Sequence, residues 1–204
     1  MATRRYEQRQ RAETAEQTRR RIVDAVIERL REAPAEPVSI DRIAEMAGVA
    51  RSTVYAIFGS RAGLFDAVAA DVLERDDYEQ LLEAKHEPDA REHMRVGFRT
   101  GTAMLAADRD IVRALFSMAQ LDEGAVGNSV RKREENRAAG MARLAGRLAE
   151  QDLLRPGVSA EEAENILWVL TSFESFDLLH TGRGLSTEAA ADLLSATAER
   201  ALLK

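Results

Sequence analysis

The fold of this 204-residue chain is decided by one stretch near its N-terminus, Ser39-Ile-Asp-Arg-Ile-Ala-Glu-Met-Ala-Gly48-Val-Ala-Arg-Ser-Thr-Val-Tyr-Ala-Ile-Phe58. Gly48 interrupts a helical pattern, and glycine readily adopts the positive φ that a tight turn between two helices needs. Ala44 offers a small side chain where a second helix can pack. Apolar residues flank the turn at Ile43, Ala47, Val49, Val54 and Phe58. The stretch therefore predicts two short helices that cross steeply over a turn, a helix-turn-helix.

Further helices are predicted on both sides of this stretch. A first helix over about 14–31 follows from an apolar face at helical spacing, which comprises Ile22, Val23, Val26, Ile27 and Leu30. Pro34 and Pro37 end that helix, and Ser39 occupies the N-cap position of the next. After the break at Gly59-Ser60, another helix is predicted to begin near Arg61. Residues 1–13 are polar and predict a disordered, basic N-terminal arm.

The rest of the chain predicts longer helices separated by short breaks. Ala, Leu, Arg and Glu are abundant, and these residues favour helices. The sequence therefore predicts an all-α fold with about nine helices. A three-helix domain with the helix-turn-helix would occupy 14–65, and a helical bundle would occupy 66–204. The last helices are expected at about 160–181 and 187–203, between breaks at Pro156-Gly157 and Gly182-Arg-Gly184.

Charge is distributed unevenly along the chain. The formal net charge is −6, yet residues 1–65 hold 12 basic residues against 9 acidic ones. Residues 1–21 alone hold seven arginines and three glutamates. A basic front on an acidic body suits a small module that contacts nucleic acid, attached to a body that does not. A solvated charged tail would give the same count, so charge alone leaves both interpretations open.

Several classes of protein are disfavoured by what the sequence lacks. The chain has no cysteine, and no stretch approaches the roughly 20 apolar residues that span a bilayer. Its polar start has no apolar segment of a signal peptide. The three histidines, His86, His93 and His180, lack metal-ligand spacing, and no phosphate-binding glycine loop is present. We therefore expect a soluble cytoplasmic protein that is not an enzyme, without cofactor or metal and without contact to a membrane.

A family resemblance is carried by the segment Ala47-Gly-Val-Ala-Arg-Ser-Thr-Val-Tyr-Ala-Ile-Phe-Gly-Ser-Arg-Ala-Gly-Leu-Phe65. It resembles the DNA-binding signature of the tetracycline-repressor (TetR) family, roughly A-G-V-S-x-G-T-hydrophobic-Y-x-aromatic-F, then a short turn, a basic residue and an apolar pair. The close resemblance covers about residues 18–70. Beyond them it is limited to length, helix content and a final pair of apolar helices. The resemblance implies a transcription regulator with a second domain that senses a small molecule.

The resemblance also implies contacts with double-stranded DNA at seven positions, Ser39, Arg42, Arg51, Ser52, Thr53, Tyr55 and Arg61. Arg51 would grip O6 and N7 of a guanine in the major groove. Ser39 would bind a phosphate through its hydroxyl and the helix amides. Tyr55 and Arg61 would also bind phosphates, and Ser52 and Thr53 a phosphate or a base edge. Arg42 lies on the outside of its helix and is a further candidate.

Three residues depart from the family signature. Ala50 replaces the usual serine at the N-cap of the second helix, so a side-chain cap is not expected there. Ser52 replaces a frequent glycine. Ile57 replaces a residue that often contacts DNA, and its side chain suits the core instead. The arm arginines, Arg4, Arg5, Arg9 and Arg11, either reach the minor groove or backbone or belong to a solubilising tail.

The C-terminal two-thirds of the chain resembles the ligand-binding and dimerisation domain of the family. Candidate ligand contacts are the aromatic, sulfur-bearing and polar side chains Phe98, Met104, Phe116, Met141, Trp168, Phe173, Glu174 and Asp177. Helical bundles place ligand sites between facing helices. The same apolar residues at helical spacing also suit a plain core, and the polar ones also suit a dimer seam or solvent.

The resemblance further implies a homodimer that pairs through the last two helices and binds a palindromic operator. Recognition helices of such a dimer lie one DNA turn, roughly 34–36 Å, apart. A ligand that favours one arrangement of the second domain would move the two DNA-binding heads, through the helix that begins near Arg61, and release the DNA. Repression is the family's commoner behaviour. An activator of the same architecture, and a protein-interaction module that uses the helix-turn-helix for packing, are the alternatives.

Overall fold

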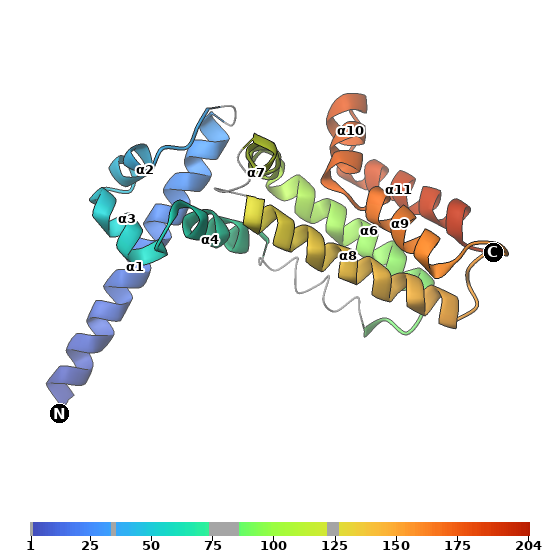
Figure 1. Ribbon diagram of the computed structural model, residues 1–204, viewed down its shortest axis with the longest axis horizontal. Coiled ribbons are helices and arrows are strands. Elements are labelled where there is room, and N and C mark those ends of the chain that lie inside the picture. Colours follow the sequence, from blue (N-terminus) through green and yellow to red (C-terminus); the bar gives the residue numbers. More distant parts are fainter. Residues whose placement is uncertain (1, 34–35, 74–85, 122–126) are drawn as a thin grey trace. The chain divides into compact units, whose positions relative to one another are not determined.

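The computed structural model describes residues 2–33, 36–73, 86–121 and 127–204, which form ten helices (Figure 1). The only β pairing within these ranges is an isolated bridge between Leu154 and Leu203. The all-α prediction is therefore confirmed, and the helix count is close to that predicted. None of the described helices combines the length and the apolar character that crossing a bilayer requires.

The chain folds into two compact units. The first comprises residues 1–72 together with 113–130, and the second comprises 73–112 together with 131–204. Two helices carry residues of both units, α7 (Arg109–Leu121) and α8 (Gly127–Glu150). The predicted boundary after residue 65 places the described residues 113–121 and 127–130 in the second domain, whereas they group with the first unit.

The first unit is built on α1 (Ala2–Glu32), α2 (Ile40–Met46), α3 (Arg51–Phe58) and α4 (Arg61–Leu73). The apolar face predicted for the first helix is buried, as are side chains from each of the other three helices: Ile43, Val54, Leu64, Phe65 and Val68. An ion pair between Arg20 and Asp71 also joins α1 to α4. Burial of large aliphatic and aromatic side chains is the main stabilising term in such a unit, at roughly 1.5–3 kcal/mol each.

The start of α1 corrects the predicted disordered arm. The helix begins at Ala2 instead of near Thr14, so residues 2–13 continue it towards the N-terminus. The physical reason lies in composition, because Ala, Arg, Gln and Glu dominate this segment and no glycine or proline interrupts it. The prediction relied on the absence of an apolar face, which determines burial and does not by itself prevent a helix from forming.

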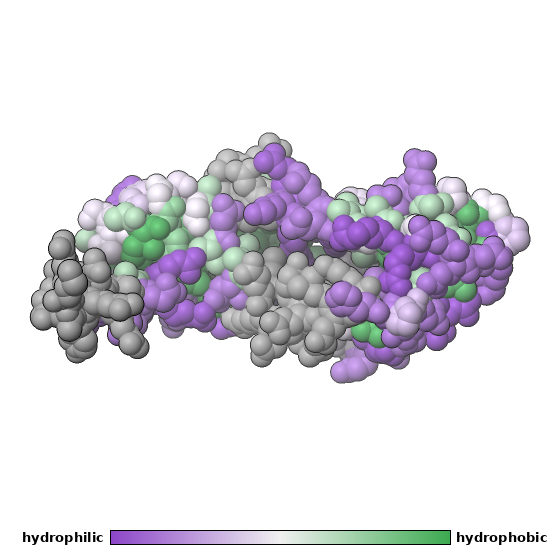
Figure 2. Space-filling model, turned by 90° about the horizontal axis from the view of Figure 1, so that it is seen from below, coloured by the Kyte–Doolittle hydropathy of each residue, from purple (hydrophilic) through white to green (hydrophobic). Residues whose placement is uncertain are grey.

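The second unit contains α6 (Ala90–Ala107), most of α8, α9 (Ala160–Leu170), α10 (Phe173–Arg183) and α11 (Thr187–Leu202). α11 packs against α6, α9 and α10. Its core includes Met94, Phe98, Leu148, Leu167 and Leu202. A bidentate ion pair also links α6 to α11. Arg95 Nε donates to Glu199 Oε1 at 2.6 Å, and Arg95 Nη2 donates to Glu199 Oε2 at 3.0 Å. On the face shown in Figure 2, hydrophilic residues cover most of this unit.

A break between α9 and α10 corrects the single helix predicted over about 160–181. α9 ends at Leu170 and α10 starts at Phe173. Ser172 has extended backbone torsions and caps α10 by accepting a hydrogen bond from the Ser175 amide at 3.1 Å. The Ser175 hydroxyl in turn donates to the Val169 carbonyl at 2.7 Å. Side-chain hydrogen bonds thus replace helical ones at this break, without the glycine or proline that usually signals it.

The N-terminus of α3 lacks a side-chain cap, as the sequence predicts. Ala50 holds the N-cap position with φ −73° and ψ 148°, the extended conformation in which a serine would cap the helix. In contrast, Ser39, Ser159 and Ser186 each accept a hydrogen bond from the first turn of their helices. The first turn of α3 therefore has fewer satisfied amides than those of α2, α9 and α11.

We predict that Ala50→Ser raises the free energy of unfolding by about 1 kcal/mol, because the backbone already has the capping conformation. Urea denaturation followed by circular dichroism would measure the change. Ala56→Ser is the matched control, since it adds the same hydroxyl to an exposed position of α3 away from the cap. An increase no larger than that of the control would contradict the prediction.

Gly63 marks a close backbone approach between α4 and the end of α3. A Cβ atom at this position would lie 2.2 Å from the Phe58 carbonyl oxygen. Nearby, the Gly63 amide donates to the Ser60 hydroxyl at 3.0 Å, which caps α4. Because the neighbouring atom belongs to the backbone, it cannot rotate away from an added methyl group. The α3–α4 connection therefore needs a glycine for space.

We predict that Gly63→Ala lowers the free energy of unfolding by about 1–3 kcal/mol, because the added methyl group forces the backbone to shift. Gly101→Ala in α6 is the control, since a Cβ there meets no atom within 4 Å. That control should instead stabilise the protein by up to about 1 kcal/mol through higher helix propensity. Chemical denaturation of both variants checks the pair, and equal effects would refute the steric argument.

Candidate nucleic-acid interface

The turn between α2 and α3 has the geometry that the sequence predicts. Gly48 has φ +62°. Its amide donates to the Glu45 carbonyl at 3.0 Å, and the Val49 amide donates to the Ala44 carbonyl at 2.9 Å. These two bonds form a Schellman motif, which satisfies the last carbonyls of α2 and turns the chain sharply. Ala44 and Val54 are buried on the two sides of this turn, so the two helices present their other faces outwards.

The outward face of α3 carries most of the polar side chains predicted to contact DNA. Arg51, Ser52 and Tyr55 are exposed, and Thr53 is half-buried. Val54, which lies between them in sequence, points into the core with 2% of its surface exposed. The structure therefore brings Arg51, Ser52 and Tyr55 together on an accessible helix surface. Ile57 is half-buried, in line with a partial role in packing.

Arg51 is held by two neighbours. Its Nη1 donates to Asp41 Oδ1 and Oδ2 at 3.1 and 2.9 Å, and its Nη2 lies 3.4 Å from the Tyr55 hydroxyl. The guanidinium also lies over the Tyr55 ring, with its central carbon 5.6 Å from the ring centroid. The hydrogen bond with Tyr55 and the charge of Asp41 raise the pKa of Arg51 above its ordinary value. The side chain is thus charged and oriented while remaining exposed.

The other three predicted DNA contacts lie on neighbouring elements. Ser39 is exposed, and its hydroxyl caps α2 at 3.5 Å from the Arg42 amide. Arg42 is exposed and forms an ion pair with Glu45 at 2.9 Å. Arg61 is half-buried at the start of α4, where its guanidinium lies 5.4 Å from the centroid of the Phe65 ring. Arg61 therefore contributes to packing, and its phosphate contact stays a prediction.

The sequence analysis did not predict that two arginines of this surface pair with acidic residues, Arg42 with Glu45 and Arg51 with Asp41. Arg42 and Glu45 are three residues apart on one helix, a spacing that brings side chains together and could have been recognised. Asp41 and Arg51 are ten residues apart on different helices. Only the turn at Gly48 brings these two together, and no local spacing rule predicts their contact.

The predicted ligand contacts do not converge on one site. Phe98 and Phe173 are buried, and Phe98 belongs to the core cluster against which Met141 packs. Met104 and Asp177 are half-buried, and Trp168 and Glu174 are exposed. Phe116 belongs to the first unit, whereas the other seven belong to the second. Residues chosen for apolar character at helical spacing include core residues, and the ligand-binding role of this set stays a prediction.

Trp168 takes part in a polar contact between α8 and α9. Arg137 donates hydrogen bonds to the Trp168 carbonyl and, at 2.9 Å, to the Thr171 hydroxyl. Its guanidinium carbon also lies 4.9 Å from the Trp168 ring centroid, and it pairs with Glu134. A cation at the C-terminal end of α9 interacts favourably with the helix dipole. These contacts join the end of α9 to α8.

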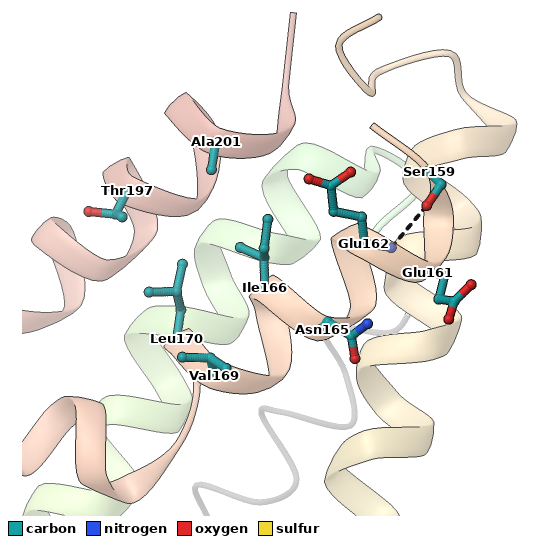
Figure 3. Close-up of a pocket in the computed structure, with 9 residues that line it drawn as sticks. All are labelled: Ser159, Glu161, Glu162, Asn165, Ile166, Val169, Leu170, Thr197 and Ala201. Atoms are coloured by element: carbon teal, nitrogen blue, oxygen red, sulfur yellow. Dashed lines mark hydrogen bonds between the residues drawn. The ribbon is translucent and has the colours of Figure 1, made fainter. Parts of the chain in front are cut away.

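A groove of about 680 Å³ lies on the second unit between α9 and α11 (Figure 3). Ile166 and Leu170 of α9 face Thr197 and Ala201 of α11 across it. Val169 also lines the groove and is 53% exposed. None of the eight predicted ligand contacts lines this groove. Among the described side chains, no group of three or more His, Asp or Glu residues is placed to hold a metal ion.

Comparisons with known proteins bear on both units. The sequence pattern of the family described as bacterial regulatory proteins, tetR family, matches residues 22–68, which span α1 to α4. No curated protein matches the chain significantly.

Solved structures share the fold over nearly the whole chain. NalD of Pseudomonas aeruginosa, the secondary repressor of the MexAB-OprM multidrug efflux pump, is 21% identical with a TM-score of 0.72, over 94% of this chain and 98% of NalD. A TetR transcription regulator of Haloarcula marismortui is 18% identical with a TM-score of 0.71, over 93% and 99% of the two chains. A TetR-like regulator of Rhodococcus sp. is 23% identical with a TM-score of 0.67, over 90% and 94%.

The matched residues 22–68 contain the buried face of α1, the Gly48 turn and the exposed face of α3. Residues 22–68 therefore carry the sequence pattern of the tetR family of bacterial regulatory proteins, and the chain as a whole shares its fold with the solved regulators.

Proposed function

We propose that this regulator is a repressor that binds a palindromic DNA operator as a homodimer, in the cytoplasm, and is released by a small molecule. The observation that carries the DNA-binding part is the exposed face of α3, where Arg51, Ser52 and Tyr55 lie together beyond the Gly48 turn. A helix of this kind fits the major groove, and an arginine near its start can read a guanine edge. The repressor part is supported by the likeness to NalD, itself a repressor.

Exposed apolar side chains on the last helices support dimerisation there. Trp168 and Val169 of α9, Leu178 of α10 and Leu193 of α11 are between 42% and 69% exposed. Leu178 is the most exposed of the four, with 69% of its surface accessible. Burying such a side chain in an interface is worth roughly 1.5–3 kcal/mol. The apolar groove between α9 and α11 is continuous with this set through Val169. A two-fold dimer through these helices would pair each side chain with the same surface of a second copy.

The small-molecule effector would bind within the second unit. Helical bundles hold such ligands between facing helices, and this unit has apolar side chains on each of its helices. Release of DNA requires that the ligand bind more tightly to the arrangement with low DNA affinity, since equal affinity shifts no equilibrium. Because α4 ends at the boundary between the two units, it is one covalent route for such a change, and α7 and α8, which carry residues of both units, are the others.

We predict that Arg51→Ala lowers the affinity for a cognate duplex by about 10- to 100-fold, with a much smaller effect on shuffled DNA. The cognate duplex would be selected by the protein from a pool of randomised duplexes. Fluorescence anisotropy across a salt series would measure both affinities. Ser117→Ala, at an exposed position of α7 outside the helix-turn-helix, is the control. No enrichment of any sequence by the wild-type protein would overturn the proposed function.

We predict that Leu178→Glu and Leu193→Glu each weaken the dimer by at least about 10-fold, because they place a charge in an apolar contact. Sedimentation equilibrium would measure the dissociation constant. Ala103→Glu, at an exposed position of α6, adds the same charge elsewhere and should leave the dimer unchanged. A dimer that tolerates both leucine variants would place the interface on another surface.

A further inference from the structure

The contact between Asp41 and Arg51 joins the two helices of the helix-turn-helix across their exposed side. Asp41 is the second residue of α2, and Arg51 is the first residue of α3. One guanidinium nitrogen, Nη1, donates to both carboxylate oxygens, at 3.1 and 2.9 Å. Their side chains are 67% and 57% exposed, so the pair lies on the surface that the proposed function turns towards DNA.

This geometry leaves the other edge of the guanidinium available. Asp41 occupies Nη1 alone, and Tyr55 makes only a long contact of 3.4 Å to Nη2. An arginine reads guanine with two donors in a fork, and Nε and Nη2 form such a fork on the side away from Asp41. The carboxylate and the Tyr55 ring thus restrict the rotation of a long side chain before it meets DNA. A pre-oriented donor loses less conformational entropy on binding.

The charge of Asp41 weakens the binding of DNA that lacks a matching guanine. Attraction to phosphates supplies essentially all of the affinity for non-specific DNA. Asp41 cancels the charge of Arg51 and adds a carboxylate that phosphates repel. A duplex that offers guanine O6 and N7 to the oriented fork compensates for this repulsion through direct hydrogen bonds, whereas a duplex without them does not.

We propose that Asp41 is a specificity-determining residue, which directs Arg51 towards a guanine edge and weakens binding to DNA that lacks one. This inference rests on the proposed function, because it requires that α3 reads DNA. Asp41 acts through Arg51 and is a positioning residue. Its effect on sequence preference should therefore disappear when Arg51 is absent.

The chain offers a matched control on the same helix. Glu45 also lies on α2, is 71% exposed, and pairs with an arginine, Arg42, at 2.9 Å. Glu45→Gln and Asp41→Asn remove the same charge and keep a similar shape. The two pairs differ in one respect, since Arg42 and Glu45 lie on one helix and do not hold a residue of α3. General loss of negative charge should affect both variants equally, whereas loss of orientation should affect only Asp41→Asn.

The experiment uses full-length protein and a duplex that the wild type selects from a randomised pool. Fluorescence anisotropy would give affinities for this duplex, for a shuffled duplex of equal composition, and for the selected duplex with single guanines replaced by 7-deazaguanine, which lacks the N7 acceptor. The proteins would be wild type, Asp41→Asn, Glu45→Gln, Arg51→Ala and the Asp41→Asn/Arg51→Ala double variant. Thermal denaturation would show that each variant is folded.

We expect Asp41→Asn to bind shuffled DNA more tightly and to lower the ratio of specific to shuffled affinity by about 10-fold. Its salt dependence on shuffled DNA should steepen by about 0.9 in log–log slope, because Arg51 becomes free to contact a phosphate. At one of the guanines, replacement by 7-deazaguanine should lower the DNA affinity of the wild type more than the DNA affinity of Asp41→Asn. Glu45→Gln should strengthen both affinities alike and keep the ratio. The double variant should have the same ratio of specific to shuffled affinity as Arg51→Ala.

Two results would overturn the inference while leaving the proposed function intact. One is a wild type that selects a duplex, with Asp41→Asn and Glu45→Gln changing the affinity ratio equally. The other is a reduced ratio for Asp41→Asn that persists in the Arg51→Ala background, since Asp41 would then act independently of Arg51. If the wild type selects no duplex at all, the proposed function fails, and the inference fails with it.

Discussion

The direction in which α3 leaves α2 depends on one backbone conformation, the positive φ of Gly48. The two amide bonds that follow from it, from Gly48 and Val49 back to α2, turn the chain and close the end of α2. This turn also brings Asp41 beside Arg51 and leaves Val54 buried against the core. A side chain at residue 48 would carry the strain of a left-handed conformation even though the space around it is open. The exposed surface of α3 is therefore a consequence of a steric property of glycine.

The sequence was sufficient for features that depend on local physics. The helix cap at Ser39 follows from a hydroxyl before a helical segment, and it is confirmed. The buried face of α1 follows from a 3.6-residue periodicity, and it too is confirmed. Gly48 and the apolar residues around it indicated the helix-turn-helix, which α2, α3 and the positive φ of Gly48 confirm. These features need only a few neighbouring residues, so tertiary structure does not alter them.

Features that depend on contacts between distant residues could not be predicted in the same way. The break between α9 and α10 involves Arg137, which is more than 30 residues away in sequence. The Asp41–Arg51 pair needs the turn between them to be built first. The helical start of α1 was missed for a different reason, because polar composition was interpreted as disorder although its residues favour helices. For the proposed ligand contacts, hydrophobic spacing does not separate a cavity wall from a filled core, as Phe98 illustrates.

The break between α9 and α10 has a consequence for the mechanics of the second unit. Thr171 has φ −94° and ψ 4°, close to helical values, whereas Ser172 has ψ 155°. A continuous helix and the bent segment therefore differ mainly by rotation about a single backbone bond. No proline ring or left-handed glycine locks that bond, and a few hydrogen bonds of roughly 0.5–1.5 kcal/mol each hold it in place. The angle of the bend is therefore set by these hydrogen bonds together with the packing of Phe173 and Phe176, which are buried on α10 directly after it.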